Sequence, residues 1–157
     1  MVQRTIVENN RIRKAVIELL CDMNLEYFLT ANFNRDTNYE AARNTLKEWH
    51  ARLDRALLGG SWSRKTWNER TQFVAFAEHF DSNLHWHLLL RLGGGADAKR
   101  FEAEADQCWK KLVIGGSMDV QKLDTDEDKE RTANYVTKDL WQQRAIESFV
   151  LSDEFRN

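Results

Sequence analysis

Two histidines separated by one residue, His85 and His87, lie in the apolar run 84–90. Side chains alternate between the two faces of a β-strand, so both imidazoles are expected to project from the same face. Glu78 lies on the neighbouring predicted strand, across a turn short enough to bring it beside the histidines. Two imidazoles and one carboxylate hold a divalent metal and leave coordination positions open, as Lewis-acid catalysis on a phosphate requires. His79 is a weaker candidate than Glu78 for the third ligand. Adjacent residues of a strand point to opposite faces, so His79 should point away from the histidine pair unless a β-bulge shifts the register.

The segment 134–138 contains a second pair of reactive side chains, Tyr135 and Lys138. Residues three apart share a face of a helix, and this segment belongs to the last predicted helix. An activated tyrosine hydroxyl is a nucleophile, and an ammonium group stabilises negative charge that develops beside it. Taken alone, the pair is also compatible with a tyrosine packed on the sheet and a solvated lysine.

Hydrophobic periodicity and turn residues predict the elements that must position these side chains. The expected elements are helices over 4–22, about 37–58, 97–112 and about 125–143, and strands over 25–33, 71–78, 84–92 and 118–123. Asp36 or Thr37 is expected to cap the second helix, and Asp124 or Thr125 the last one, which should run to about Gln143. The two middle strands should pair antiparallel, because the turn between them is short.

After the first helix the predicted order is β-α-β-β-α-β-α, a split β-α-β unit repeated once. The expected fold is therefore α+β and ferredoxin-like, with a central antiparallel sheet and two helices on one face. Residues 1–157 are interpreted as one domain, with the helix over 4–22 appended at the N-terminus.

The composition restricts the classes of function. The formal net charge of −2 argues against a protein that coats nucleic acid without selectivity, although segment 35–70 has more Lys and Arg than Asp and Glu. No apolar run approaches the roughly 20 residues that span a bilayer, so no membrane partner is expected. The N-terminus lacks the apolar core of a secretory signal, which favours an intracellular protein. Cys21 and Cys108 are interpreted as free thiols.

The polar connection 61–70 interleaves cations with aromatic residues. Its candidate DNA-binding residues are Trp62, Arg64, Lys65, Trp67 and Arg70. Aromatic rings stack on unpaired bases, while Arg and Lys follow the phosphates. The alternative is a surface loop whose tryptophans pack into the core. A second candidate surface is formed by the cations of the first predicted helix, Arg4, Arg11, Arg13 and Lys14.

Three motifs resemble, in order and position, those of the HUH endonucleases, a family of rolling-circle replication initiators, transposases and relaxases. They are Phe28-Leu29-Thr30 on the first strand, His85-Trp86-His87 on the third and Tyr135-Val136-Thr137-Lys138 on the last helix. The resemblance covers residues 25–142 and implies the same split β-α-β sheet, with Mn²⁺ or Mg²⁺ on the histidine pair. Positions 139 and 142 hold Asp and Gln, so the chain resembles the single-tyrosine rather than the two-tyrosine members.

The function that this resemblance implies is metal-dependent nicking and rejoining of single-stranded DNA through a covalent 5′-phosphotyrosine. His85, His87 and Glu78 would hold the metal, Tyr135 would attack the phosphate, and Lys138 would neutralise developing charge or position an activating water. The expected substrate is a single-stranded origin or hairpin of a plasmid or virus, in the bacterial cytoplasm or, for a eukaryotic virus, in the nucleus. The chain has no P-loop motif, so a helicase would be a separate protein or a missing C-terminal domain.

Alternatives within and outside this chemistry stay open. A single-tyrosine transposase is the next interpretation. A relaxase ranks after it, because relaxases usually carry three histidines and a third is not obvious in this sequence. A non-catalytic nucleic-acid-binding module on the same fold, and a metal phosphoesterase that forms no covalent adduct, belong to other classes.

Overall fold

The structure, a computed structural model, describes residues 5–156. Its helices are α1 (Ile6–Asp22), α2 (Tyr39–Leu58), α3 (Ala98–Leu112), α4 (Asp126–Val136) and α5 (Gln143–Ser148), with short 3₁₀ helices η1 (Trp62–Arg64) and η2 (Ser152–Phe155). Its strands are β1 (Tyr27–Asn32), β2 (Gln72–Glu78), β3 (His85–Arg91), β4 (Ser117–Lys122) and β5 (Val150–Leu151). In this described part of the chain, no helix is long and apolar enough to cross a bilayer.

The five strands form one antiparallel sheet in the order β4-β1-β3-β2-β5. α2 connects β1 to β2, a short turn joins β2 to β3, and α3 connects β3 to β4. This is the split β-α-β arrangement, and the predicted α+β fold with a central antiparallel sheet is confirmed. The short strand β5, which the sequence pattern did not predict, extends the sheet beyond β2 by pairing Leu151 with Val74.

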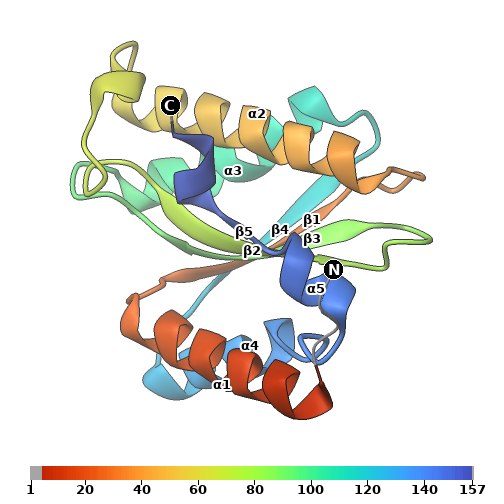
Figure 1. The fold of residues 1–157 in the computed structure, drawn as a ribbon. Coiled ribbons are helices and arrows are strands. Elements are labelled where there is room, and N and C mark those ends of the chain that lie inside the picture. Colours follow the sequence, from red (N-terminus) through yellow and green to blue (C-terminus); the bar gives the residue numbers. More distant parts are fainter. Residues whose placement is uncertain (1–4, 157) are drawn as a thin grey trace.

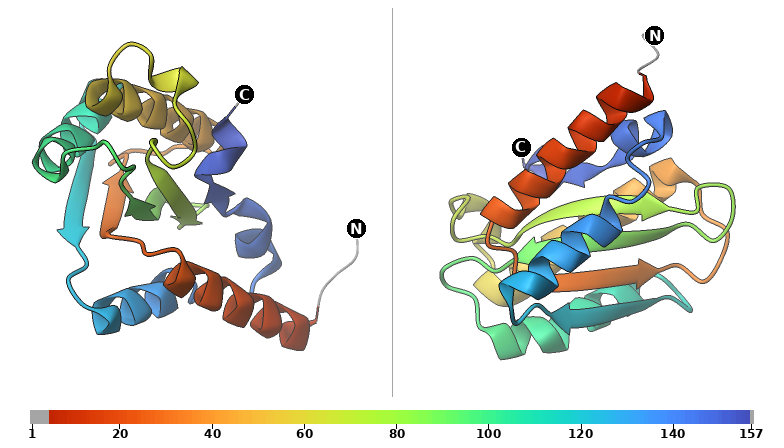
Figure 2. Two further views of the ribbon diagram at one scale, coloured as in Figure 1. Left: turned by 90° about the vertical axis from the view of Figure 1, so that its left-hand side faces the viewer. Right: turned by 90° about the horizontal axis from the view of Figure 1, so that it is seen from below.

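Helices cover both faces of the sheet, as Figure 1 and the side view in Figure 2 show. α2 and α3 lie on one face and bury the larger core, which includes Trp49, Phe101 and Trp109. α1 and α4 lie on the other face over a second core that includes Leu20 and Val136. The two helices predicted for one face are thus α2 and α3, while the N-terminal helix helps to build a second helical layer.

The N-terminal end of α2 differs from the prediction. Asn38 caps the helix, rather than Asp36 or Thr37, because its side-chain oxygen accepts a hydrogen bond from the Ala41 amide at 2.8 Å. The C-terminal end is where the sequence indicates, at Gly59, whose φ of +86° favours glycine.

The last predicted helix was placed too long, because α4 ends at Val136 instead of continuing to about Gln143. Arg13 on α1 donates hydrogen bonds to the carbonyls of Thr137 and Asn134, at 3.0 and 3.3 Å. These bonds satisfy carbonyl groups that a further helical turn would otherwise use, so the chain can turn away at this point. The residues that follow form a separate short helix, α5.

A polar cluster is buried between α2 and the start of β2. Asp54 accepts hydrogen bonds from Nε of Arg70 at 2.8 Å and from the Thr71 hydroxyl at 2.6 Å. Nε2 of His50 lies 2.9 Å from the same hydroxyl. Burial lowers the pKa of His50 below its ordinary value; Asp54 opposes this shift and Arg70 adds to it.

Because of this shift, we expect the free energy of unfolding to fall as the pH drops below about 6.5, the ordinary pKa of an exposed histidine. The unfolded chain takes up the His50 proton first, so the stability that neutral His50 contributes is complete above that pH and is lost toward its lower folded-state pKa. The contribution of His50 to stability is measured by urea unfolding of the wild type and of His50→Gln between about pH 7 and pH 5. In the variant, the glutamine amide nitrogen replaces Nε2. Equal pH slopes in the two proteins would contradict the prediction.

Candidate metal centre and tyrosine

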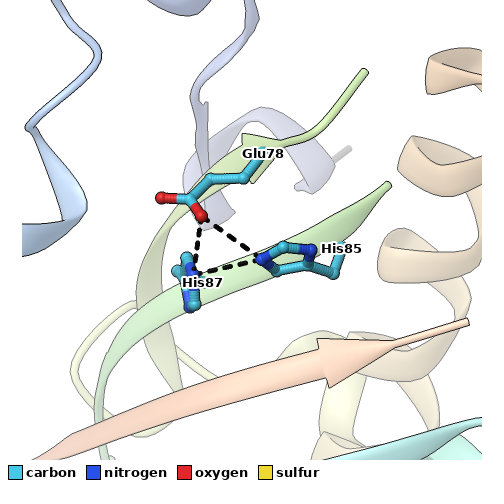
Figure 3. Close-up of side chains that lie close together, drawn as sticks. All are labelled: Glu78, His85 and His87. Carbon is cyan, nitrogen blue, oxygen red and sulfur yellow. Dashed lines mark hydrogen bonds and ion pairs between the residues drawn. The ribbon is translucent and has the colours of Figure 1, made fainter. Parts of the chain in front are cut away.

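Glu78, His85 and His87 meet at the end of β2 and the beginning of β3 (Figure 3). Oε2 of Glu78 lies 3.1 Å from Nε2 of His87 and 3.3 Å from Nε2 of His85, and the two Nε2 atoms are 3.2 Å apart. Neighbouring ligands of an octahedral ion are about 3 Å apart when each metal–ligand bond is about 2.1 Å. The three donor atoms therefore fit one divalent ion. Among residues 5–156 they form the one group of three or more His, Cys, Asp or Glu side chains that could share an ion.

The register of the hairpin explains this convergence. Glu78 pairs directly with His85, and His87 follows on the same face of β3. Trp86 points to the opposite face, where it is fully buried and donates its Nε1–H to the Ala42 carbonyl at 3.1 Å. The buried indole anchors β3 in the larger core, so the two imidazoles stand on a rigid strand rather than on a loop.

Strand β1 provides the surroundings of His87. Thr30 is its register partner, and Oγ1 of Thr30 lies 3.2 Å from Nδ1 of His87. The Phe28 ring stacks on the imidazole with a centroid distance of 5.4 Å. In the tautomer whose Nδ1–H donates to the threonine hydroxyl, Nε2 carries a lone pair for a metal instead of a proton shared with Glu78, which is how outer partners orient metal-bound histidines. The sequence motif contains Thr30, but its spacing alone does not indicate this role.

We therefore expect Thr30→Val, which keeps the shape of the side chain and removes the hydroxyl, to weaken Mn²⁺ binding about tenfold. Thr30→Ser retains the hydroxyl and should stay close to the wild type. Calorimetric titration with Mn²⁺ measures both affinities. Equal affinities for the valine and serine variants would show that His87 is oriented without this hydrogen bond.

Glu78 is held in its ionised form despite its burial. Burial alone would raise its pKa, but hydrogen bonds from His85, His87 and Lys138 outweigh it and keep the pKa well below the usual range. Oε1, the oxygen without a dashed line in Figure 3, forms an ion pair with Nζ of Lys138 at 2.9 Å. Burial would lower the pKa of Lys138, but Glu78 and the Tyr135 hydroxyl raise it above its ordinary value. The site therefore combines a carboxylate that attracts cations with a permanently charged ammonium group.

Tyr135 lies beside Glu78, His85 and His87, the candidate metal-binding group, on the same face of the sheet. Its ring centroid is 5.4 Å from that of His87, and 46% of the residue is exposed. Lys138 is not on the same helix, contrary to the prediction, because α4 ends at Val136. The turn that follows still brings Nζ of Lys138 to 3.9 Å from the centroid of the Tyr135 ring. The arrangement thus joins a place for a Lewis acid, an accessible phenol and a cation that can neutralise developing negative charge.

His79 has a backbone conformation that strand periodicity does not anticipate. Its φ of +57° lies in the left-handed region, which is uncommon for residues other than glycine, and its ring lies 5.2 Å from that of His85, centroid to centroid. The residue follows the last residue of β2, so the expected alternation of faces no longer applies to it. Its ring nitrogens are not part of the group whose donor atoms lie within 4.8 Å of one another.

The predicted DNA-binding segment 61–70 lies at the far end of β2 from the metal-binding group. The segment precedes Gln72, the first residue of β2, whereas Glu78 is the last. A strand of this length spans about 20 Å, so the two regions are well separated. Arg64 is exposed and Lys65 is half-buried, and their contact with DNA stays a prediction.

The remaining residues of that segment contact the protein itself. Arg70 is buried, pairs with Asp54, and lies over the Trp62 ring at 5.0 Å. Trp67 is half-buried and carries the Arg156 guanidinium over its ring at 5.2 Å. Both tryptophans are half-buried and lie outside the two hydrophobic cores, so the alternative in which they pack into the core is not shown either.

The cations of the N-terminal helix also include one that bonds to the protein itself and others that are exposed. Arg13 binds carbonyls at the end of α4 and so helps to hold the segment that carries Tyr135. Arg11 and Lys14 are exposed, and Arg4 lies outside the described residues. Nothing in the local sequence pattern distinguishes the structural arginine from its neighbours.

Comparisons with known proteins found no match to this chain. No protein-family model, no curated protein and no solved structure matches it. Similarity to characterised proteins therefore does not indicate a substrate, cofactor or partner for this chain.

Proposed function

We propose that this chain is a metal-dependent endonuclease and strand transferase of the HUH type, which nicks and rejoins single-stranded DNA. The observation that carries the proposal is the position of Tyr135, whose half-exposed ring lies 5.4 Å from the ring of His87. A phosphotyrosine mechanism requires a nucleophile and a metal-binding group on the same side of the molecule. This placement depends on the packing of α4 against the sheet and is therefore independent of the short motifs.

Each residue has a defined part in the proposed reaction. A divalent ion bound by Glu78, His85 and His87 supplies Lewis-acid chemistry toward a phosphate oxygen. The Tyr135 oxygen attacks the phosphorus, and the bond from phosphorus to the 3′ oxygen of the preceding nucleotide breaks. The electron pair leaves on that oxygen, which takes up a proton to form a 3′ hydroxyl, while the tyrosine proton passes to water. The Lys138 ammonium neutralises charge on the phosphoryl oxygens.

The covalent 5′-phosphotyrosine conserves the energy of the broken phosphodiester bond. Attack by a 3′ hydroxyl reverses the step and restores the phenol, so strands are rejoined without ATP. Such chemistry suits the initiation of rolling-circle replication of a plasmid or virus at a single-stranded origin or hairpin. A single-tyrosine transposase or relaxase would use the same residues.

Mn²⁺ and Mg²⁺ are the proposed ions. Carboxylate and water ligands suit both, but imidazole ligands suit transition metals better than Mg²⁺. We therefore expect activity with either ion and tighter binding of Mn²⁺.

The proposal is tested with a pool of single strands and hairpins, labelled at either end and incubated with Mn²⁺ or EDTA. With Mn²⁺, a label at the 3′ end should migrate with the protein in SDS, and a label at the 5′ end should appear on a shortened free strand. Shortened strands without a protein-bound label would identify a plain phosphoesterase. Binding without any cleavage would identify a non-catalytic module, and either result overturns the proposal.

A further inference from the structure

A polar cavity of about 450 Å³ adjoins the metal-binding group. It lies between the turn that follows β2 and the connection from α4 to α5. Glu78 and Lys138 belong both to this cavity and to the site, while Phe80 and Arg144 line it outside the site. Ligand sites for small molecules typically occupy about 300–1,000 Å³, so the cavity is large enough for one nucleotide.

Arg144 and Phe80 form a flat surface in this cavity. The guanidinium carbon lies 4.2 Å from the centroid of the Phe80 ring, and Nη1 lies 3.1 Å from the Asp81 carboxylate. These two contacts favour one orientation of the planar guanidinium. Nucleobases stack on guanidinium planes and on aromatic rings with little dependence on their identity. The surface therefore has the chemistry of a base-stacking platform.

Lys138 connects this platform to the nucleophile. Its Nζ lies 2.9 Å from Oε1 of Glu78 and 3.9 Å from the centroid of the Tyr135 ring, and the residue also lines the cavity. A phosphate beside Lys138 would therefore lie close to both the phenol and the metal-binding carboxylate. The base attached to that phosphate would point into the cavity.

The charges around the cavity make nucleotide binding depend on the metal. Its lining contains three carboxylates, those of Glu78, Asp81 and Asp139, and two cations, Lys138 and Arg144, which sum to a formal charge of −1. A divalent ion on Glu78 would change this sum to +1. A phosphate is repelled in the first case and attracted in the second.

We propose that this cavity is a nucleotide subsite. It holds the nucleotide on the 3′ side of the broken bond, whose own 5′ phosphate Tyr135 attacks, and its base stacks on Arg144. The inference rests on the proposed function and adds to it the residues that hold the substrate. Because stacking does not select among bases, all four deoxynucleotides should bind.

The test is calorimetric titration of the full chain with each 2′-deoxynucleoside 5′-monophosphate, in Mn²⁺ and in EDTA, with inorganic phosphate as a second probe. We expect binding only in Mn²⁺, tighter for nucleotides than for phosphate, and about tenfold weaker in Arg144→Ala. Arg144→Lys keeps the charge but not the plane, so it should also weaken binding. Arg100→Ala, which removes an exposed arginine on α3, is the matched control and should change affinity less than about twofold.

Equal nucleotide affinity in the wild type and in Arg144→Ala would overturn the subsite, as would equal affinity for nucleotides and inorganic phosphate. These results are distinguishable from failure of the proposed function. A wild type that forms the DNA adduct but does not bind nucleotides refutes the subsite alone. Arg144-dependent nucleotide binding without any adduct supports the subsite and refutes the endonuclease.

Discussion

Tyr135→Phe is expected to abolish the covalent protein–DNA adduct, lowering its rate of formation by about 1,000-fold or more. The substitution removes only the hydroxyl. The phenylalanine ring can keep the ring contacts of the tyrosine, with Phe28 at a centroid distance of 6.2 Å and with His87 at 5.4 Å. The packing of α4 should therefore persist, and affinity for single strands should stay within about twofold of the wild type.

The measurement is the yield of SDS-resistant labelled protein in Mn²⁺, with fluorescence anisotropy of a labelled strand to follow binding. Tyr39→Phe is the matched control, because Tyr39 lies on α2, on the other face of the sheet, and donates its hydroxyl to the Ser148 carbonyl at 2.7 Å. That variant loses one internal hydrogen bond, worth about 1 kcal/mol, and should form the adduct at the wild-type rate. An adduct that persists in Tyr135→Phe would show that another residue is the nucleophile.

The convergence of Glu78, His85 and His87, the candidate metal-binding group, could be predicted because local geometry builds it. His85 and His87 share a face through the alternation of side chains along a strand, and the short turn brings Glu78 into direct register with His85. The order of strands and helices likewise follows from hydrophobic periodicity and turn residues, which are local in the sequence. A split β-α-β sheet is the topology expected for that order, and the structure has it.

Other features of the site depend on residues far apart in the sequence. Arg13 donates a hydrogen bond to the carbonyl of Thr137, which lies 124 residues later in the sequence. This contact is made just after the point where α4 ends, earlier than predicted. Thr30 reaches the ring of His87 across 57 positions. Periodicity within a window of one helix or strand contains no information on such contacts, so neither was predicted.

Arg70 shows the same limit for the predicted DNA-binding segment. Alternation of cations with tryptophans is typical of a surface that binds single strands. The guanidinium of Arg70 is nevertheless paired with Asp54, which α2 contributes, and packs over Trp62. A buried ion pair needs a partner on another element, and the composition of the segment does not reveal whether one exists.

Mn²⁺ is expected to stabilise the wild-type chain against unfolding and to lose most of this effect in His87→Ala. A ligand that binds only the folded state, present at 100 times its Kd, raises the free energy of unfolding by about 2.7 kcal/mol. Removing one of three donors should weaken binding about 100-fold or more, which would leave at most about 0.4 kcal/mol at the same Mn²⁺ concentration. Urea unfolding in Mn²⁺ and in EDTA measures both values.

His79→Ala is the matched control for that experiment. It removes an exposed imidazole whose ring lies 5.2 Å from that of His85 but whose nitrogens are outside the converging donor atoms. Its Mn²⁺ stabilisation should equal that of the wild type. A loss as large as that of His87→Ala would make His79 a ligand and would change the proposed donor set.

The comparison between Mn²⁺ and EDTA also separates a metal site from an internal hydrogen-bond cluster. Glu78 is 6% exposed, and His87→Ala removes one of its partners, so this variant should be less stable than the wild type even without metal. That loss is the same in both solutions and cancels when the two free energies of each protein are subtracted. Only coordination produces a difference between the two solutions that is large in the wild type and mostly lost in His87→Ala. If the wild type unfolds identically in Mn²⁺ and in EDTA, the three side chains only bond to one another, and Tyr135 has no Lewis acid beside it to activate a phosphate.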